Sequence, residues 1–290
     1  MKILNWLMTG RSRNPFLLGI NERNRQLVYR HNERMYYQLA DDKILTKSIL
    51  EPEGIPCAKT YAIVDKIGDI EKCWNRLQNF DALAIKPSKG SGGGGIMILK
   101  KKSDKWYKNG EAISTSEILL HMAKIIMGQF SLNANDRVLI EECIESHDFF
   151  KKIYSDGVPD LRVILLNEKI LMGMLRLPTA KSEGKANLHQ GGLGIGIDLQ
   201  KGTLLKAYDG ESYHTSHPDS GGSILGVQLP FWKEILNLSI KTAEQFPLKY
   251  IGVDIVIDQN IGPMIMEINV RPGLGIQMAN ECGLKKSIFA

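Results

Sequence analysis

Residues 251–257 (IGVDIVI) and 264–270 (MIMEINV) decide the fold, because each is a short apolar run interrupted by one acid. The connection, residues 258–263 (DQNIGP), is rich in residues that form tight turns. Two apolar runs joined in this way predict an antiparallel β-hairpin.

The register of this hairpin determines which polar side chains meet. If Asp258 pairs with Pro263, then Asp254 lies directly opposite Glu267. Alternation along the second strand puts Asn269 on the same face as Glu267. Two carboxylates and an amide oxygen are therefore expected to converge.

Directly opposed acids repel one another, so this arrangement predicts a compensating cation. Oxygen ligands of this kind suit Mg²⁺ or Mn²⁺ better than zinc. We therefore predict that Asp254, Glu267 and Asn269 bind a divalent metal that leaves room for the phosphates of a nucleoside triphosphate. The alternative is that the two acids lie on a solvated face of the hairpin.

A second signal is the glycine-rich stretch at residues 88–95 (SKGSGGGG), which follows a predicted strand at 82–87 and precedes one at 96–99. Lys86 lies just before it, so a cation and many backbone N–H groups are offered together, as phosphate requires. No Gly-Lys-Ser/Thr sequence closes the stretch, which excludes a Walker A loop. A flexible linker is the alternative interpretation.

The remaining pattern predicts an α+β protein. Apolar spacing and a Ser114-x-x-Glu117 capping box predict helices near 41–50, 69–80, 114–129 and 231–246. Apolar runs predict strands at 138–144, 161–166 and 169–177, followed by a glycine-rich loop at 178–196. Residues 1–40 are expected to be a short, partly helical lead-in, followed by lobes at 41–144 and 145–290.

Composition limits the class of protein. The 290 residues are 43% hydrophobic and 24% charged, and no apolar run approaches the roughly 20 residues that span a bilayer. The four cysteines are scattered, which predicts reduced thiols and a cytoplasmic location. The net charge of +5 is modest and concentrated near the start, where a solvated basic surface is the simplest interpretation. We expect no nucleic-acid partner and no membrane span; a homodimer is the default oligomer.

Several motifs resemble the ATP-grasp superfamily, specifically the branch that includes the ribosomal-protein glutamate ligase. They are DK at 42–43 leading to GIP at 54–56, the lysine and glycine loop at 86–95, VLIEECI at 138–144, DLR at 160–162, KANLHQGG at 185–192 and EINVRPG at 267–273. The usual N-terminal α/β domain of the family is missing here or reduced to about 40 residues. In its length and in its N-terminal region the chain is similar to the group called glutamate-ligase-related proteins.

The resemblance implies a fold in which two α/β lobes clasp ATP between antiparallel sheets, and a magnesium-dependent use of ATP. It implies nucleotide contacts from Lys43, Lys86, Ser88, Gly92, Gly93, Glu142, Cys143, Asp160, Lys185 and Asn187. The metal ligands that it implies, Asp254, Glu267 and Asn269, are those deduced from the hairpin.

The expected activity is that of an ATP-dependent carboxylate–amine ligase. ATP would phosphorylate a small-molecule or peptide carboxylate, and an amine such as an amino acid would attack the acyl phosphate, adding glutamate or another amino acid to an acceptor. Arg162 and Arg271 are the candidate catalytic residues, because a guanidinium binds carboxylate or phosphate oxygens bidentately; each could instead be a structural ion-pair partner. A kinase and a non-catalytic nucleotide-binding scaffold remain alternatives.

Overall fold

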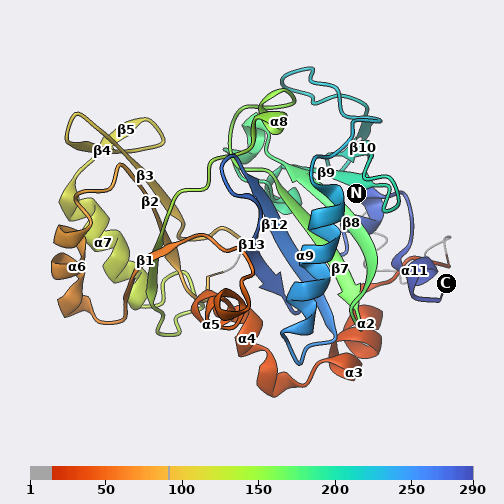
Figure 1. Cartoon of the computed structure of the whole chain (residues 1–290), viewed down its shortest axis with the longest axis horizontal. Helices are drawn as coiled ribbons and strands as arrows, with labels where there is room; N and C mark the ends of the chain where they lie inside the picture. Colours follow the sequence, from red (N-terminus) through yellow and green to blue (C-terminus); the bar gives the residue numbers. More distant parts are fainter. Residues whose placement is uncertain (1–14, 91, 290) are drawn as a thin grey trace. The chain divides into compact units, whose positions relative to one another are not determined.

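The structure, a computed structural model, describes residues 15–90 and 92–289, which divide into two compact units (Figure 1). The first unit comprises residues 15–41, Ser48–Cys57 and 145–289. The second comprises Asp42–Lys47 and Ala58–Ile144. Each unit has a hydrophobic core of its own.

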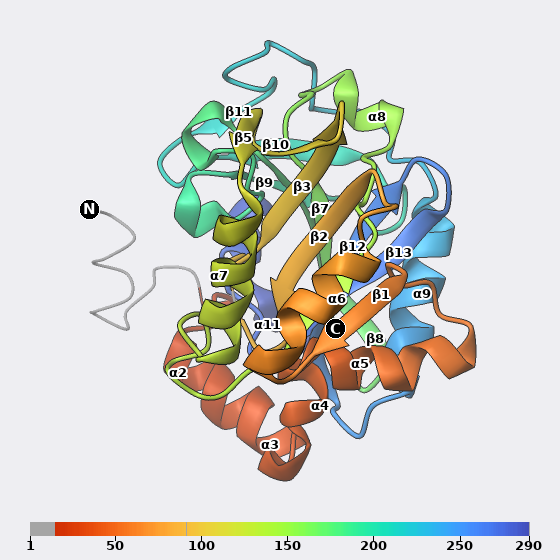
Figure 2. The same ribbon diagram turned by 90° about the vertical axis from the view of Figure 1, so that its left-hand side faces the viewer.

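The second unit is a six-stranded antiparallel sheet in the order β1-β6-β2-β3-β4-β5. Its strands are β1 (Thr60–Val64), β2 (Ala82–Pro87), β3 (Met97–Lys102), β4 (Lys105–Lys108), β5 (Glu111–Ile113) and β6 (Val138–Glu141). Two helices, α6 (Ile70–Arg76) and α7 (Thr115–Ile126), pack together on one face of this sheet, as Figure 2 shows. Apolar side chains from the helices and the central strands form the core beneath them, including Trp74, Leu83, Ile118 and Ile140.

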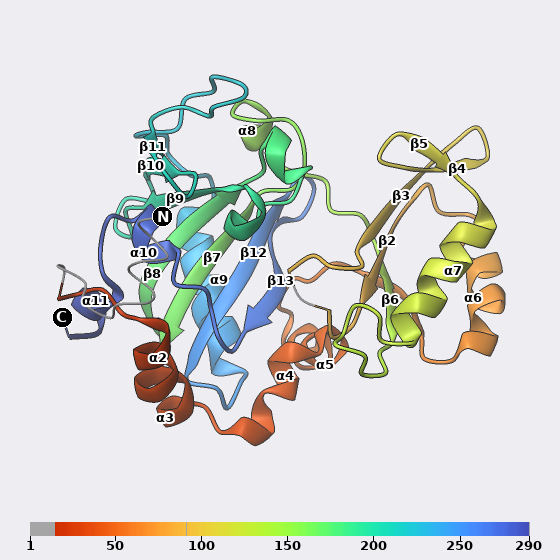
Figure 3. The ribbon, with the colours of Figure 1, turned by 180° about the vertical axis from the view of Figure 1, so that it is seen from behind.

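The first unit is a seven-stranded antiparallel sheet in the order β11-β10-β9-β8-β7-β12-β13. Its strands are β7 (Asp160–Leu166), β8 (Lys169–Leu177), β9 (Leu193–Ile197), β10 (Leu204–Tyr208), β11 (Tyr213–His214), β12 (Tyr250–Asp258) and β13 (Gly262–Asn269). Helix α9 (Trp232–Glu244) crosses one face of the sheet, and α10 (Ile276–Ala279) lies on the other (Figures 1 and 3). Every residue of β12 is buried, which explains its nearly continuous apolar sequence.

Short helices make up the rest. They are α2 (Ile20–Arg23), α3 (Tyr29–His31), α4 (Gln38–Asp41), α5 (Lys43–Leu50), α8 (Asp148–Lys151) and α11 (Leu284–Phe289). Leu18, Leu27 and Val28 of the N-terminal segment are buried in the core of the first unit. The part of the predicted lead-in before residue 15 lies outside the described residues. No helix of the described chain is long and apolar enough to cross a membrane.

The α+β class with two antiparallel sheets is confirmed, and so is the capping box at Ser114 and Glu117. The prediction of one loop over residues 178–196 is wrong at its end, because β9 begins at Leu193 and all of its residues are buried. The strands β4, β5, β10 and β11 were not predicted.

The register of the β12–β13 hairpin corrects one assumption. Asp258 pairs with Gly262 rather than with Pro263, so the hairpin starts one residue out of the predicted register. An irregularity between Asp254 and Ile255 then inserts one residue of β13, and Asp254 does lie opposite Glu267. The expected pairing is reached because a β-bulge offsets the displaced turn.

Candidate functional site

In the first unit, the carboxylate of Asp254 is the centre of a buried polar cluster. Arg162 on the neighbouring strand β7 binds it bidentately, with Nε 2.7 Å from Oδ1 and Nη2 2.6 Å from Oδ2. Arg176 on β8 donates to Oδ2 from 2.8 Å, and the Asn269 amide does so from 3.1 Å. Only 1% of Asp254 is exposed. Burial acts to raise its pKa, but Arg162 and Arg176 outweigh burial and hold the pKa below the ordinary value.

Arg176 also donates a hydrogen bond to Asp160, so a single guanidinium joins two buried carboxylates. Burial raises the pKa of Asp160 to about 6, although Arg176 opposes the shift. The same two acids raise the pKa of Arg176 against the effect of its burial. Two carboxylates and two guanidiniums thus balance in charge within an apolar sheet.

Strand alternation places this cluster on the face away from α9. A side chain added at Gly173 of β8 would meet Trp232 of α9, so odd-numbered positions of β8 face that helix. Arg176 and Met174 therefore face the opposite side. Met174 pairs with Arg162 across the ladder, which puts Arg162 and Asp254 on that side as well.

A divalent metal fits this face by its donor chemistry. Glu267 of β13 lies opposite Asp254. The side chains of Glu267 and Asn269 are partly exposed, and all three residues carry oxygen donors. The compensating charge that we expected from a metal is, however, supplied by Arg162 and Arg176. Among the described residues no three His, Cys, Asp or Glu side chains form a metal-binding group, so a metal held by Asp254 and Glu267 would need a ligand of another kind, such as the amide oxygen of Asn269.

Three more predicted residues lie in loops of the same unit. Lys185 is exposed in the loop after β8, and Asn187 caps the next turn, its Oδ1 accepting from the His189 N–H. Arg271 is exposed just after β13, with its guanidinium carbon 4.9 Å from the centroid of the Tyr37 ring.

In the second unit, Lys86 at the end of β2 pairs with Glu141 at the end of β6, with Nζ 2.8 Å from Oε2. Lys47 of α5 binds the other oxygen of Glu141 at 2.5 Å. All three side chains are at most 10% exposed. Burial acts to raise the pKa of Glu141, but Lys86 and Lys47 outweigh it and lower the pKa. Two cations on one carboxylate leave this cluster with a net positive charge.

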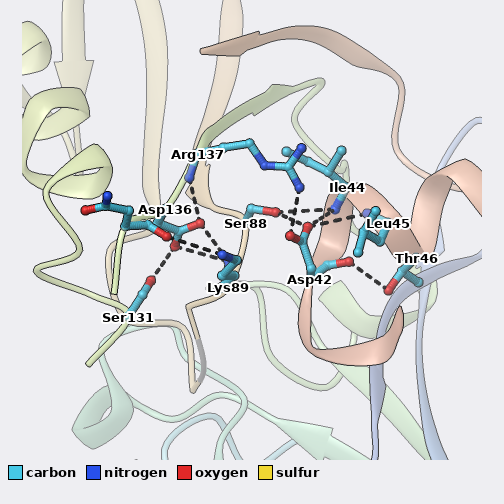
Figure 4. A network of polar contacts seen from close by, with 10 residues as sticks. Asp42, Ile44, Leu45, Thr46, Ser88, Lys89, Ser131, Asp136 and Arg137 are labelled. Carbon is cyan, nitrogen blue, oxygen red and sulfur yellow. Dashed lines mark hydrogen bonds and ion pairs between the residues drawn. The ribbon is translucent and has the colours of Figure 1, made fainter. Parts of the chain in front are cut away.

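Two buried aspartates fix the entry to the glycine loop, as Figure 4 shows. Asp42 accepts hydrogen bonds from the Ser88 hydroxyl, from Nη2 of Arg137 at 2.7 Å and from the Ile44 N–H at 3.0 Å. Asp136 accepts from the Lys89 N–H at 3.1 Å and from the Ser131 hydroxyl. The base of the loop is therefore attached both to the start of α5 and to the segment before β6.

The loop beyond this base is built from glycines in the left-handed region. Gly92 and Gly93 have φ angles of 62° and 75° and are exposed. Gly95, at 76°, packs so closely that an added Cβ would lie 2.6 Å from the Phe130 ring. The ammonium of Lys43 lies 2.6 Å from the Gly90 carbonyl oxygen. Ser88, predicted to bind phosphate, is completely buried and donates its hydroxyl hydrogen to Asp42.

Glu142 and Cys143 follow β6, where the resemblance implied adenine contacts. Both are partly exposed, and Glu142 accepts the Lys59 N–H at 2.6 Å. Burial raises the pKa of the Cys143 thiol, so this residue is a neutral, weakly polar surface.

Sequence reasoning did not single out Arg176, Lys47 and Glu141. Arg176 could have been found as the one charge inside the apolar run 170–177. Lys47 lies one helical turn beyond Lys43, on a helix whose buried face could not be assigned from eight residues. Glu141 is adjacent to Glu142, and without the neighbouring strands the sequence does not tell which of the two side chains is buried.

Comparison with curated proteins finds relatives named probable alpha-L-glutamate ligase. The protein of that name from Marinomonas sp. (strain MWYL1) is 26% identical over 257 residues, which are 87% of this chain and 63% of that protein. The one from Saccharophagus degradans is 26% identical over 251 residues, or 86% and 62%. This chain therefore spans somewhat less than two thirds of the length of these relatives.

Solved structures show a shared fold at low identity. D-alanine–D-alanine ligase from Bacillus anthracis, complexed with ATP, has a TM-score of 0.51 and 16% identity over 87% of this chain and 64% of that one. Biotin carboxylase from Campylobacter jejuni has a TM-score of 0.54 and 9% identity, over 87% and 46%.

The match to a family model extends over most of the chain. The model is described as sugar-transfer associated ATP-grasp, and it matches residues 22–289. This range contains both sheets and all the predicted site residues, and it includes most of the N-terminal segment. The resemblance to ATP-grasp proteins related to glutamate ligases is confirmed: this chain belongs to the sugar-transfer associated ATP-grasp family.

Proposed function

We propose that this protein is an ATP-dependent, ADP-forming carboxylate–amine ligase that works through an acyl phosphate. Membership of the ATP-grasp family and the names of the relatives support ligase chemistry. The observation that carries the proposal is the cluster in the first unit, where Arg162 and Asn269 converge on Asp254 opposite Glu267. Such a face offers cationic donors for a transferring phosphoryl group and oxygen donors for a divalent cation.

In the first unit, we assign Asp254, Glu267 and Asn269 as ligands of Mg²⁺ or Mn²⁺. When bound, the metal supplies charge neutralisation for the phosphates. Arg162 is placed to bind oxygens of the transferring group, because it is 12% exposed and is held by its bidentate contact with Asp254. Arg271 is more exposed and is assigned to a substrate carboxylate or to the acyl phosphate formed from it.

For the nucleotide in this unit we assign Lys185 and Asn187 as contacts and Asp160 as a residue that acts indirectly. Asp160 acts through Arg176, whose orientation it fixes. Lys185 and Asn187 belong to the exposed loop after β8, where a cation and an amide can approach phosphate or ribose oxygens.

In the second unit, we assign Lys43, Lys86 and the loop residues Ser88, Gly92 and Gly93 to the ATP phosphates, with Ser88 contributing by position rather than by its buried hydroxyl. Lys86 and Lys47 share one carboxylate, so the excess positive charge is available to an anion. Glu142 and Cys143 are assigned to adenine.

The reaction that we propose transfers the γ-phosphoryl group of ATP to a carboxylate oxygen, which releases ADP. The amine nitrogen then attacks the acyl carbon, the C–O bond to phosphate breaks, and the amine loses a proton as inorganic phosphate leaves. The residues assigned here bind and orient the reacting groups and neutralise charge, which is the main requirement of phosphoryl transfer. Glutamate or another amino acid added to an acceptor is the substrate class that the relatives' names suggest.

The experiment that tests this proposal measures ADP and phosphate release from ATP and Mg²⁺ in the presence of amino acids, singly and in pairs. We expect release to require both a carboxylate and an amine, and Glu267→Ala to abolish it. Glu234→Ala is the matched control, because Glu234 is exposed on α9, away from the cluster, and should leave the rate unchanged.

Other outcomes identify the alternatives. A phosphorylated product that accumulates without any amine would make the protein a kinase. ATP binding without turnover under every condition would indicate a non-catalytic role. Equal activity of Glu267→Ala and Glu234→Ala would contradict the assigned metal site.

A further inference from the structure

Arg271 is an exposed cation that forms no ion pair with an acid in the described part of the chain. None of the ion pairs among the described residues involves it, and its recorded contact is with the Tyr37 ring, 4.9 Å from the guanidinium carbon. A guanidinium that rests on an aromatic face keeps its N–H donors, which lie in its plane, for other partners. Arg271 is therefore oriented but still able to bind an oxyanion.

A second arginine, Arg23, lies beneath the backbone of Arg271. Its Nη1 donates to the Pro272 carbonyl oxygen at 2.9 Å and to that of Arg271 at 3.4 Å. Its Nε and Nη2 donate to Oδ1 of Asn24 at 3.1 and 2.7 Å. Only 8% of Arg23 is exposed, and within the described residues all its acceptors are neutral oxygens.

A buried cation without a carboxylate is costly, so a structural role alone is a poor explanation for it. Burial lowers the pKa of Arg23; among its neighbours Arg271 also lowers it, whereas Tyr250 and Tyr29 raise it. The hydroxyl of Tyr250, which is close enough to Arg23 to influence this pKa, is buried without a hydrogen-bond partner among the described residues. The surroundings of Arg271 are thus electropositive.

The segment that carries Arg23 and Tyr37 is fixed by two side-chain amides, one that joins it to helix α10 and one that joins it to strand β12. Gln277 accepts the Leu18 N–H at 2.9 Å and donates to the Leu18 carbonyl at 3.1 Å. Asn32 bonds the Tyr250 backbone in the same two-way manner, at 2.7 and 2.9 Å. Each amide bonds both the N–H and the carbonyl oxygen of one backbone residue, so the segment is held on both sides of Arg23.

We propose that Arg23 and Tyr37 are positioning residues, which hold Arg271 so that it binds an oxyanion of the substrate, a carboxylate or the acyl phosphate made from it. This inference rests on the proposed function for the role of Arg271, and it assigns the N-terminal segment to the substrate-binding structure of the first unit. Tyr37 fixes the guanidinium plane, and Arg23 fixes the backbone from which the side chain extends.

The first test does not depend on turnover. Phenylglyoxal modifies arginine guanidiniums, and its rate at Arg271 can be followed by quantitative peptide mass spectrometry. We expect Tyr37→Leu to speed the modification of Arg271 by about threefold, since the ring no longer covers the guanidinium, and Tyr37→Phe to leave the rate unchanged. Tyr29→Leu is the matched control, because Tyr29 is exposed on the same segment.

Inorganic phosphate and acetate serve as the probe oxyanions in the same assay. Either should slow the modification of Arg271 in the native protein, and less so in Tyr37→Leu and Arg23→Met. Stronger protection by phosphate identifies the acyl phosphate as the group bound, and stronger protection by acetate identifies the carboxylate. Arg25→Met, at an exposed arginine two residues away, should behave as native.

The second test uses the ligase assay. Tyr37→Leu and Arg23→Met should raise the KM of the carboxylate substrate about tenfold and leave the KM of ATP unchanged, with Tyr37→Phe restoring the native value. A merely structural loss would lower kcat and affect both substrates.

The two proposals fail separately. An unchanged modification rate of Arg271 in Tyr37→Leu overturns the positioning role, whether or not the ligase is active. The absence of any ligase reaction, together with the expected modification and protection pattern, overturns the proposed function and leaves the oxyanion site of Arg271 standing.

Discussion

At the scale of single residues, Glu141 has the most demanding environment in the second unit. Its carboxylate is buried and forms ion pairs with both Lys47 and Lys86. These two cations hold the pKa of Glu141 below the ordinary value of 4.5 in spite of burial. A group whose pKa is lower in the folded state binds fewer protons there than in the unfolded chain. Its contribution to stability is present above about pH 4.5 and is lost as the pH falls through the folded-state pKa.

We therefore predict that Glu141→Gln weakens the acid sensitivity of this unit. At pH 7 the substitution should lower the free energy of unfolding by about 3–5 kcal/mol, because two buried cations lose their carboxylate. As the pH falls below 4.5 the difference between the variant and the native protein should shrink, and it should vanish below the folded-state pKa of Glu141. Urea unfolding followed by the fluorescence of Trp74 and Trp106, both buried in this unit, measures the difference. Glu71→Gln, at an exposed position of α6, is the control; the same pH profile in both variants would contradict the prediction.

In the first unit, Arg176 is the shared cation of two buried acids. Arg176→Met should cost about 3–5 kcal/mol of unfolding free energy, because Asp160 loses its hydrogen bond from a guanidinium and Asp254 loses one of two. Arg176→Lys should cost less, since it keeps the charge but not the planar fork. Lys169→Met, at the exposed start of the same strand, should be nearly neutral in the same thermal and urea measurements.

At the scale of elements, α7 tests how far local sequence determines a boundary. The Ser114 side chain accepts the Glu117 N–H, and Glu117 accepts the Ser114 N–H in return. Ser114→Ala should destabilise the second unit by about 1 kcal/mol, the usual cost of losing an N-cap. Ser116→Ala, two residues later and also exposed, should change stability little; equal losses in urea unfolding would show that the cap is not the cause.

The same elements show where prediction from sequence ended. Helices α7 and α9 and strands β2, β8 and β12 were predicted because their apolar spacing is regular. Strands β4 and β5, with only four and three residues, have too little periodicity to be recognised. The sequence of β9, LGIGI, was interpreted as loop because of its glycines, which are needed where α10 approaches: a side chain at Gly196 would meet the Ala279 carbonyl oxygen at 2.5 Å.

The candidate site shows a similar division. The pairing of Asp254 with Glu267 was predicted from an assumed turn register, and it holds because the bulge that was missed offsets the displaced turn. The arginine compensation of Asp254 depends on β7 lying between β12 and β8 in one sheet, which is a long-range fact. The contacts of Arg271 with Arg23 and Tyr37 join residues more than 200 positions apart, and no local pattern indicates them.

At the scale of the whole molecule, the two separate cores predict two unfolding transitions. Leu18→Ala removes a buried side chain from the first core, and Leu83→Ala removes one from the second. Each should cost about 2–5 kcal/mol and lower the midpoint of one calorimetric transition while leaving the other in place. A single transition that both variants lower equally would show that the two cores unfold as one.

The hydrogen bonds of Asn32 and Gln277 that hold the N-terminal segment also determine when the first unit can finish folding during synthesis. Asn32 leaves the ribosome 218 residues before Tyr250, and Leu18 leaves 259 residues before the Gln277 that holds it. At ordinary translation rates that interval is about 10 to 50 s. Until it ends the segment lacks the strand and the helix that hold it, whereas the last of the six strands of the second unit is complete at Glu141. The first-made part of the described chain is therefore held in its folded position last. Until then a nascent chain exposes the apolar side chains of this segment, which is the kind of surface that a chaperone binds.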